Sequence, residues 1–168
     1  MKQRILSLLV DNTSGLLTRV AGLFARRGYN IDSISAGVTA DPRFTRITVV
    51  CTGDDLVLEQ IQNQLAKQVD VRDIKVLKPE SSVNRELALI KVRVNAGERQ
   101  NVASLTDIFR ANIIDVGKDS LIIELTGTKS KLDAFLKLLD GYEILELART
   151  GITGLSRGLD DVFFPDED

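Results

Sequence analysis

Several residue types that carry enzyme chemistry are scarce in this sequence. Its 168 residues include no histidine, no tryptophan, one cysteine and three prolines. Histidine is the commonest metal ligand and the commonest general base, so its absence excludes ordinary zinc sites and histidine-dependent triads. The single cysteine, Cys51, has no partner for an internal disulfide. We therefore assign no residue to catalysis or to metal binding.

Long apolar runs and a strong net charge are also missing. The first apolar run, 5–10, stops at Asp11-Asn12, which is short of the ~18 residues of a membrane span and of the apolar core of a signal peptide. The 22 basic and 24 acidic residues give a formal net charge of −2, so no positive field would hold a nucleic acid. We expect a cytoplasmic protein that binds neither membranes nor nucleic acid.

Hydrophobic periodicity repeats one order of elements twice. In the first half it predicts a strand at 4–10, a helix at 15–27, strands at 31–38 and 47–51, a helix at 54–68 and a strand at 69–77. In the second half it predicts a strand at 88–94, a helix at 102–109, strands at 113–116 and 121–125, a helix at 132–139 and a strand at 144–147. Each half has the order βαββαβ. This order predicts an α+β fold of two ferredoxin-like modules, each an antiparallel sheet with helices on one face.

The same patterns set the expected domain boundaries. We expect a first domain at 1–78, a linker at 79–84, a second domain at 85–158 and an acidic tail at 159–168. A module of roughly 70 residues has a thin core, so we expect a homodimer. The tail carries five acids in ten residues. It is either a disordered, solvated end or a peptide whose Phe163 and Phe164 dock on a partner.

Several motifs have a structural interpretation that outweighs a functional one. Cys51 is interpreted as a buried structural cysteine, because no histidine is present to activate it. The acids Asp54 and Asp55 are interpreted as caps of the helix that follows them. The glycine-rich stretch 151–158 has no phosphate-binding spacing and no helix after it. RNA binding is disfavoured because Phe44 is the one aromatic residue on the two central strands, and such an aliphatic face is expected to meet another protein surface.

The segment between the first strand and the first helix is the more informative candidate site. Free N–H groups at the start of a helix can receive a carboxylate, and Gly15 has no Cβ to obstruct a ligand. Ser14 is the expected N-cap of the helix. Asn12 offers a donor and an acceptor. Asn30 follows the other end of the same helix, so it could join this site only from a second subunit.

These residues resemble a known family. The match to the regulatory small subunit of acetolactate synthase, also called acetohydroxyacid synthase, extends over nearly the whole chain. Strand-Asn-x-Ser-Gly-helix followed by Arg-Gly-Tyr-Asn-Ile is specific to the N-terminal ACT domain of that family. The resemblance rests on the segments 5–20, 22–24, 27–31 and 154–158. It implies an N-terminal ACT domain and a C-terminal ACT-like domain.

The resemblance also implies a function. A member of this family has no activity of its own and binds no cofactor; its large catalytic subunit uses thiamine diphosphate, Mg²⁺ and FAD. That subunit condenses two pyruvates to acetolactate, or pyruvate with 2-oxobutyrate, in branched-chain amino-acid biosynthesis. The small subunit raises the activity of its partner and confers feedback inhibition by valine.

The resemblance further implies where valine binds. In this family the positions matching Asn12, Gly15 and Asn30 are associated with valine sensitivity, and ACT domains bind amino acids where two copies pair. The expected valine site at the dimer interface consists of Asn12, Ser14, Gly15, Leu16, Asn30 and Ile31. Two alternatives stay open: a free-standing amino-acid-sensing ACT protein that controls transcription or another enzyme, and an enzyme with intrinsic activity.

Overall fold

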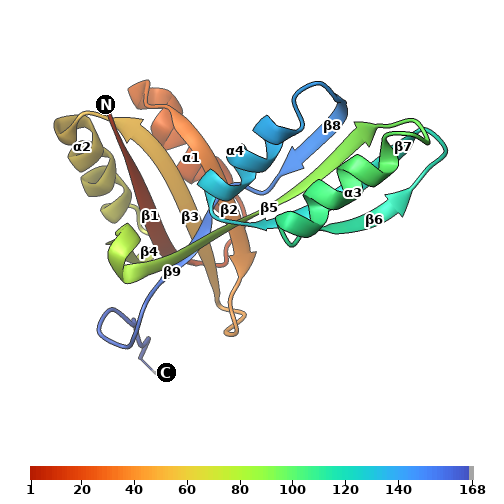
Figure 1. Ribbon diagram of the computed structural model, residues 1–168. Coiled ribbons are helices and arrows are strands. Elements are labelled where there is room, and N and C mark those ends of the chain that lie inside the picture. Colours follow the sequence, from red (N-terminus) through yellow and green to blue (C-terminus); the bar gives the residue numbers. More distant parts are fainter. Residues whose placement is uncertain (167–168) are drawn as a thin grey trace. The chain divides into compact units, whose positions relative to one another are not determined.

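The computed structural model describes residues 1–166 (Figure 1). Contacts divide the chain into two units, one of residues 84–151 and one that joins residues 1–83 to the segment from Ile152 onwards. The first half comprises β1 (Lys2–Asp11), α1 (Leu16–Arg27), β2 (Ile31–Val38), β3 (Phe44–Gly53), α2 (Asp55–Ala66) and β4 (Val71–Val76). The second comprises a short 3₁₀ helix η1 (Pro79–Ser81), β5 (Ser82–Arg93), α3 (Arg99–Ile108), β6 (Asn112–Val116), β7 (Ser120–Gly127), α4 (Lys129–Leu138), β8 (Glu143–Arg149) and β9 (Thr153–Ser156). No helix within 1–166 is long and apolar enough to cross a membrane.

The N-terminal unit contains the predicted ferredoxin-like sheet. Its strands are antiparallel in the order β2-β3-β1-β4. The central pair, β1 and β3, is in continuous register from Lys2 opposite Gly53 to Asp11 opposite Phe44. The outer strand β2 pairs with β3 on one side, and no strand within residues 1–166 pairs with its other edge. This confirms the fold class for the first module.

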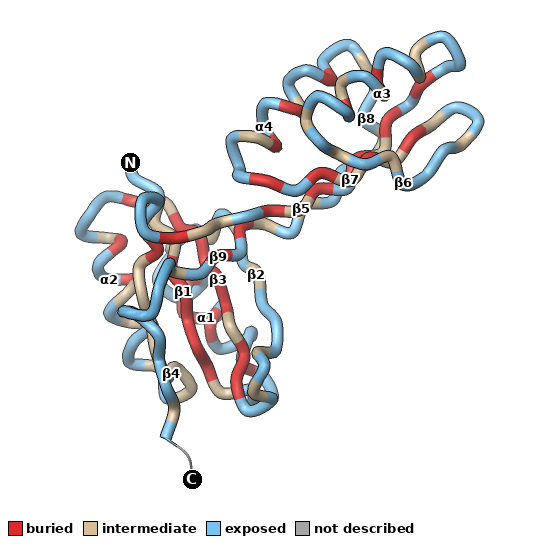
Figure 2. Tube along the Cα trace, turned by 60° about the horizontal axis from the view of Figure 1, so that its bottom comes forward, coloured by how far each residue is buried: buried red, intermediate tan, exposed pale blue. Residues whose placement is uncertain are grey.

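The core of this unit lies between the sheet and the helices α1 and α2, which Figure 1 shows beside it. Alternate residues of β1 and β3 face the helices because successive side chains on a strand point to opposite faces. Figure 2 shows continuous buried stretches along these two strands, which means that residues on both of their faces are buried. The core consists of Leu6, Leu8, Val10, Leu16, Val20, Leu23, Phe24, Ile47, Val49, Cys51, Leu58, Ile61 and Leu65.

The face of this sheet opposite α1 and α2, here called the open face, is also largely shielded from solvent. Ser7, Thr48 and Val50 point to it and are each 1% exposed. The strand β9 lies against β3, and the N–H of Gly154 donates to Thr48 Oγ1 at 3.4 Å. The aliphatic face that the sequence assigns to another protein surface is thus covered in part by the end of its own chain.

The contacts of β9 group it with the N-terminal unit. We expected residues 152–158 to belong to the second domain, 85–158, but their contacts group them with the N-terminal unit. The physical reason is that Ile152 is buried and the N–H of Arg157 donates to the carbonyl of Ser81 at 2.8 Å. The expected linker, 79–84, is also ordered, as η1 and the start of β5.

The acidic tail is placed up to Asp166, whereas 167–168 lie outside the described residues. Residues 159–166 are exposed except for Pro165, and two contacts join them to the N-terminal unit. Lys75 Nζ donates to the carbonyl of Asp161, and Phe163 lines a pocket with Asp11 and Phe44. Whether the tail is a solvated end or a peptide that docks on a partner therefore stays a prediction.

The C-terminal unit repeats the same plan. Its antiparallel sheet has the order β6-β7-β5-β8, and α3 and α4 pack on one face. Both modules of the predicted fold are therefore confirmed. The buried residues at the centre of this unit are Ala88, Ile90, Val92, Val94, Val102, Leu121, Ile123, Leu125, Leu132, Phe135 and Leu139.

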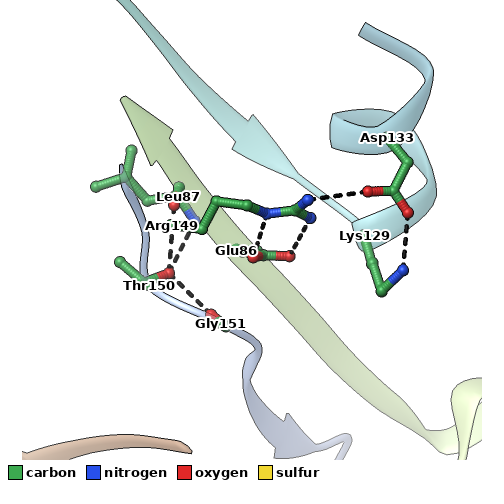
Figure 3. Close-up of polar contacts among 7 residues, drawn as sticks. All are labelled: Glu86, Leu87, Lys129, Asp133, Arg149, Thr150 and Gly151. Atoms are coloured by element: carbon green, nitrogen blue, oxygen red, sulfur yellow. Dashed lines mark hydrogen bonds and ion pairs between the residues drawn. The ribbon is translucent and has the colours of Figure 1, made fainter. Parts of the chain in front are cut away.

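An ion-pair network ties three elements of this unit together (Figure 3). Arg149 on β8 donates to both carboxylate oxygens of Glu86 on β5, at 2.7 and 2.9 Å, and to Asp133 on α4 at 3.0 Å. Lys129 donates to the other oxygen of Asp133 at 2.8 Å. The hydrogen bond from Lys129, followed by the one from Arg149, holds the pKa of Asp133 below its ordinary value. The side chain of Glu86 is 5% exposed, so its carboxylate is largely withdrawn from water and is hydrogen-bonded by Arg149 instead.

Candidate functional site

The loop between β1 and α1 begins the helix without a side-chain cap. Gly15 stands at the N-cap position with φ 77° and ψ 6°, a left-handed conformation, and no side chain bonds to the first turn. The prediction that Ser14 caps α1 is therefore wrong. A left-handed N-cap favours glycine because a Cβ is strained there. The first N–H groups of α1 thus receive no bond from a capping side chain.

The charge at this helix start favours an anion. The first turn of α1, within Leu16–Arg27, holds no acidic side chain, while Arg26 and Arg27 stand in the last turn. The N-terminal end of a helix carries about half a positive charge. A carboxylate placed at the first turn would therefore accept hydrogen bonds and oppose this charge.

Arg19 supports the loop from within α1. Its Nε donates to Asp70 at 2.7 Å, its Nη2 to Thr13 Oγ1 at 2.9 Å and its Nη1 to the carbonyl of Ser14 at 3.1 Å. Asp70 in turn is 18% exposed and accepts from Thr13 at 3.4 Å. The loop conformation is thereby fixed by one guanidinium group. Sequence reasoning missed Arg19 and Asp70, because they are 51 positions apart and meet through the fold.

Asn12 is held at the end of β1 by the turn between β2 and β3. Its N–H donates to the carbonyl of Arg43 at 2.8 Å, and its side-chain nitrogen Nδ2 donates to the carbonyl of Pro42 at 3.1 Å. The amide oxygen remains as the group that could accept from an ammonium. The structure therefore uses one of the two N–H donors of Asn12 Nδ2 and leaves the amide oxygen as an acceptor for a ligand.

A surface pocket of ≈ 410 Å³ lies between this loop and the end of β2. It is lined by Asn12, Thr13, Gly15, Leu16, Leu17, Thr18, Ala36, Gly37, Val38 and Thr45. Its volume is in the ordinary range for a small-molecule site. Three predicted site residues, Asn12, Gly15 and Leu16, line this pocket together, and Ser14 lies in the same loop without lining it.

Seven residues of the pocket were not among the predicted site residues: three from the loop and α1, and four from β2 and β3. Those of the loop and α1 are Thr13, Leu17 and Thr18. Ala36, Gly37, Val38 and Thr45 meet the loop through the antiparallel pairing of β2 with β3. Two apolar side chains at the rim of the pocket are exposed, Leu17 by 50% and Val38 by 61%. Apolar side chains so exposed at one rim suggest a surface that is covered in the working assembly.

Asn30 and Ile31 are not part of this pocket. They lie before and at the start of β2, whereas the pocket uses its last residues, 36–38. Asn30 is exposed, and its Nδ2 approaches Asp32 Oδ1 at 3.5 Å. Within one chain the two halves of the predicted site are therefore separated by the length of β2. That a second subunit brings Asn30 to the site stays a prediction.

The competing motifs have structural roles. Asp54 accepts from the N–H of Val57 at 2.8 Å and so caps α2, as predicted. Burial, reinforced by the charge of Asp32, raises the pKa of the buried Cys51 thiol to about 11. Cys51 is therefore a neutral thiol near neutral pH. Among residues 1–166 no cluster of three or more acidic or cysteine side chains could hold a metal ion.

Comparison with family models now connects this geometry to known proteins. Residues 6–73 match the "AHAS small subunit-like ACT domain", which includes the loop, α1 and the pocket. Residues 85–158 match the "Small subunit of acetolactate synthase". A relative from Methanothermobacter thermautotrophicus, a "Probable acetolactate synthase small subunit", is 48% identical over 155 residues, 92% of each chain. The chain belongs to the acetolactate synthase small subunit family.

A further relative in sequence and a solved structure support the same family. The acetolactate synthase isozyme 3 small subunit of Salmonella typhimurium is 48% identical and covers 93% of this chain and 96% of its own. The crystal structure of the Thermotoga maritima acetolactate synthase small subunit superimposes with a TM-score of 0.87 at 42% identity, covering 95% of this chain and 99% of that chain. The acetolactate synthase small subunit family, with its ACT domain and regulatory role, therefore accounts for both modules.

Proposed function

We propose that this chain activates the catalytic subunit of acetolactate synthase and confers feedback inhibition by valine. The observation that carries the proposal is the pocket of ≈ 410 Å³, in which an uncapped helix start, the Asn12 amide and an exposed apolar rim meet. These three groups match the carboxylate, the ammonium and the side chain of a small apolar amino acid. Family membership supports a catalytic partner, which would hold thiamine diphosphate, Mg²⁺ and FAD.

In the proposed complex the carboxylate lies on the first N–H groups of α1, near Gly15 and Leu16. Gly15 permits close approach because it has no side chain, and Arg19 keeps the loop in place. The ammonium donates to the oxygen of Asn12. The isopropyl group contacts apolar residues such as Leu17 and Val38. A single methylene discriminates by only about 1–3 kcal/mol, so leucine and isoleucine are the competitors to compare.

The free edge of β2 supports a dimer that completes this site. Two copies related by a twofold axis would pair their β2 strands in antiparallel fashion. If the axis passes through the middle of β2, between Ile34 and Ser35, then Ile31 of the second copy lies opposite Val38 of the first. Asn30 and Ile31 of one copy then reach the pocket of the other.

Inhibition requires valine to prefer one state of the regulated enzyme. A ligand with equal affinity for two states shifts neither, so valine must bind the less active state more tightly. A site shared by two subunits supplies such a preference, because any change in how the β2 strands meet changes the distance between Asn12 and Asn30. The small subunit itself needs no active site for this role.

Titration of the purified catalytic subunit tests the proposal. Acetolactate formation is measured at saturating cofactors while this chain is added, with and without valine. We expect the rate to rise with added chain and valine to reverse the rise. An unchanged rate, combined with valine binding to the isolated chain, would contradict the proposal and favour a free-standing amino-acid sensor. Pyruvate turnover by the chain alone would show intrinsic activity instead.

A further inference from the structure

Another surface pocket lies on the open face of the N-terminal sheet, between the end of β2 and β9. This open-face pocket has a volume of ≈ 360 Å³, which is in the ordinary range for a small-molecule site. The proposed valine pocket lies on the helix side of the same end of β2, so the two pockets are separate. The open-face pocket is lined by Ser35, Ala36, Gly37, Val38, Thr39, Arg46, Thr153, Gly154 and Leu155.

Of the described residues that line this pocket, Arg46 is the one with a charged side chain. It stands on β3 and is half-buried, and its Nη1 donates to Ser7 Oγ at 2.8 Å. Within residues 1–166 no acidic side chain forms an ion pair with it, whereas Arg72 on β4 pairs with Asp11. A half-buried cation without a partner charge favours an anion. Its planar guanidinium group suits a carboxylate in particular, because two N–H groups can donate to the two oxygens.

Gly37 is paired with Arg46 in the register of β2 and β3, and it leaves the space beside this side chain open. Its backbone does not require glycine, because its φ is not positive and the bulge of this strand pair lies between Ile31 and Ser33. A Cβ built on Gly37 would meet no atom within 4 Å. A glycine weakens a strand, and it often marks a place where a ligand approaches the backbone closely. The packing of the single chain gives no reason for this glycine, whereas a ligand in the pocket does.

The rest of the lining defines the chemistry of the ligand. Arg46 contributes one positive charge, and no acidic side chain of the described residues lines the pocket. A ligand with one negative charge therefore fits better than a zwitterion or a doubly charged phosphate. The hydroxyl groups of Ser35 and Thr153 can donate to an oxo or hydroxyl oxygen. Leu155 is 58% exposed and offers an apolar contact to a short hydrocarbon chain.

We propose that the open-face pocket binds a small oxo or hydroxy acid with a single carboxylate. The carboxylate accepts from the guanidinium group of Arg46. The oxo or hydroxyl oxygen accepts from Ser35 or Thr153, and the hydrocarbon part contacts Leu155. Gly37 leaves room for the ligand against β2. This site goes beyond the proposed function and depends neither on valine nor on a catalytic partner.

Titration of the isotope-labelled full chain with pyruvate, followed by NMR, tests the proposal. A ligand of this size should bind with a Kd on the order of 1 mM and shift the amide signals of Gly37 and Gly154. Lactate, a hydroxy acid of the same size, should bind with a similar Kd. Methyl pyruvate has no charge and alanine is a zwitterion, so each should bind at this pocket at least about tenfold more weakly.

Two variants locate the binding within the open-face pocket. Gly37→Ala should fill the pocket without disturbing the fold, and Arg46→Met should remove its cation. Each should raise the Kd for pyruvate at least about tenfold. Arg72→Met is the matched control, because Arg72 stands on the same sheet but pairs with Asp11 and lines a different pocket. Its Kd should equal that of the unmodified chain, and so should that of Gly15→Ala, which alters the proposed valine site.

An absence of saturable binding, or binding that survives both Gly37→Ala and Arg46→Met, would overturn the proposal. Inorganic phosphate that binds more tightly than pyruvate would contradict the assignment to a carboxylate. A loss of dimer mass in Arg46→Met would assign the guanidinium group to an acidic side chain of a second copy and refute the proposal. None of these measurements uses the catalytic subunit or valine, so their failure would be distinct from a failure of the proposed function.

Discussion

Replacement of Gly15 by alanine is a sharp test of how the loop before α1 is built. A non-glycine residue in the left-handed conformation loses roughly 1–2 kcal/mol. The added Cβ would also lie 3.2 Å from Nη1 of Arg19, the group that donates to the Ser14 carbonyl. Gly15→Ala should therefore lower the free energy of unfolding by about 1–2 kcal/mol. It should also displace the guanidinium group of Arg19 and obstruct a carboxylate at the first turn of α1.

We expect Gly15→Ala to weaken valine binding at least about tenfold, or 1.4 kcal/mol, while activation of the catalytic subunit persists. Calorimetric titration with valine measures the affinity, and urea unfolding measures the stability. Gly141→Ala is the matched control: Gly141 has φ 93°, no neighbouring atom lies within 4 Å of its added Cβ, and it belongs to the other unit. Unchanged valine affinity in Gly15→Ala, or an equal loss in Gly141→Ala, would refute this reasoning.

Three further predictions concern the contacts that support the two units. Arg149→Met should lower the free energy of unfolding by about 3 kcal/mol, because it leaves the buried Glu86 carboxylate unpaired, and Glu86→Gln in the same chain should recover most of the loss in a denaturant titration. Because Cys51 is buried and its pKa is raised, alkylation of its thiol should be slow at pH 8 in the folded chain. Unfolding in urea should make the alkylation fast, and fast labelling of the native thiol would contradict its burial. Arg19→Met should reduce valine affinity in calorimetry while destabilising the chain by less than about 1 kcal/mol, since its pairing with Asp70 is partly exposed.

Much of the fold could be predicted because hydrophobic periodicity is a local property. The stripe of Leu16, Val20, Leu23 and Phe24 identified α1, and all four residues are at most 6% exposed. The same logic found both sheets. The strand β9 was missed because its sequence is glycine-rich, and its place depends on contacts with Thr48 and Ser81, which lie far away along the chain.

The candidate site could be predicted in part. Asn12, Gly15 and Leu16 are neighbours in sequence, so the loop that contains them was visible in the sequence. Ser14 was mistaken for the N-cap because a serine at that position is favourable by propensity, yet the left-handed backbone at Gly15 moved the cap by one residue. The β2 side of the pocket consists of small residues that give no signal until strand pairing brings them to the loop.

A mixed dimer tests the central claim, a valine site shared by two subunits. Asn12→Ala and Asn30→Ala chains, carrying different tags, are purified as a heterodimer and titrated with valine. Each variant homodimer should bind no valine, whereas the heterodimer should bind one valine per dimer, because one of its two sites combines the intact Asn12 of one chain with the intact Asn30 of the other. A heterodimer that binds no valine would contradict the account.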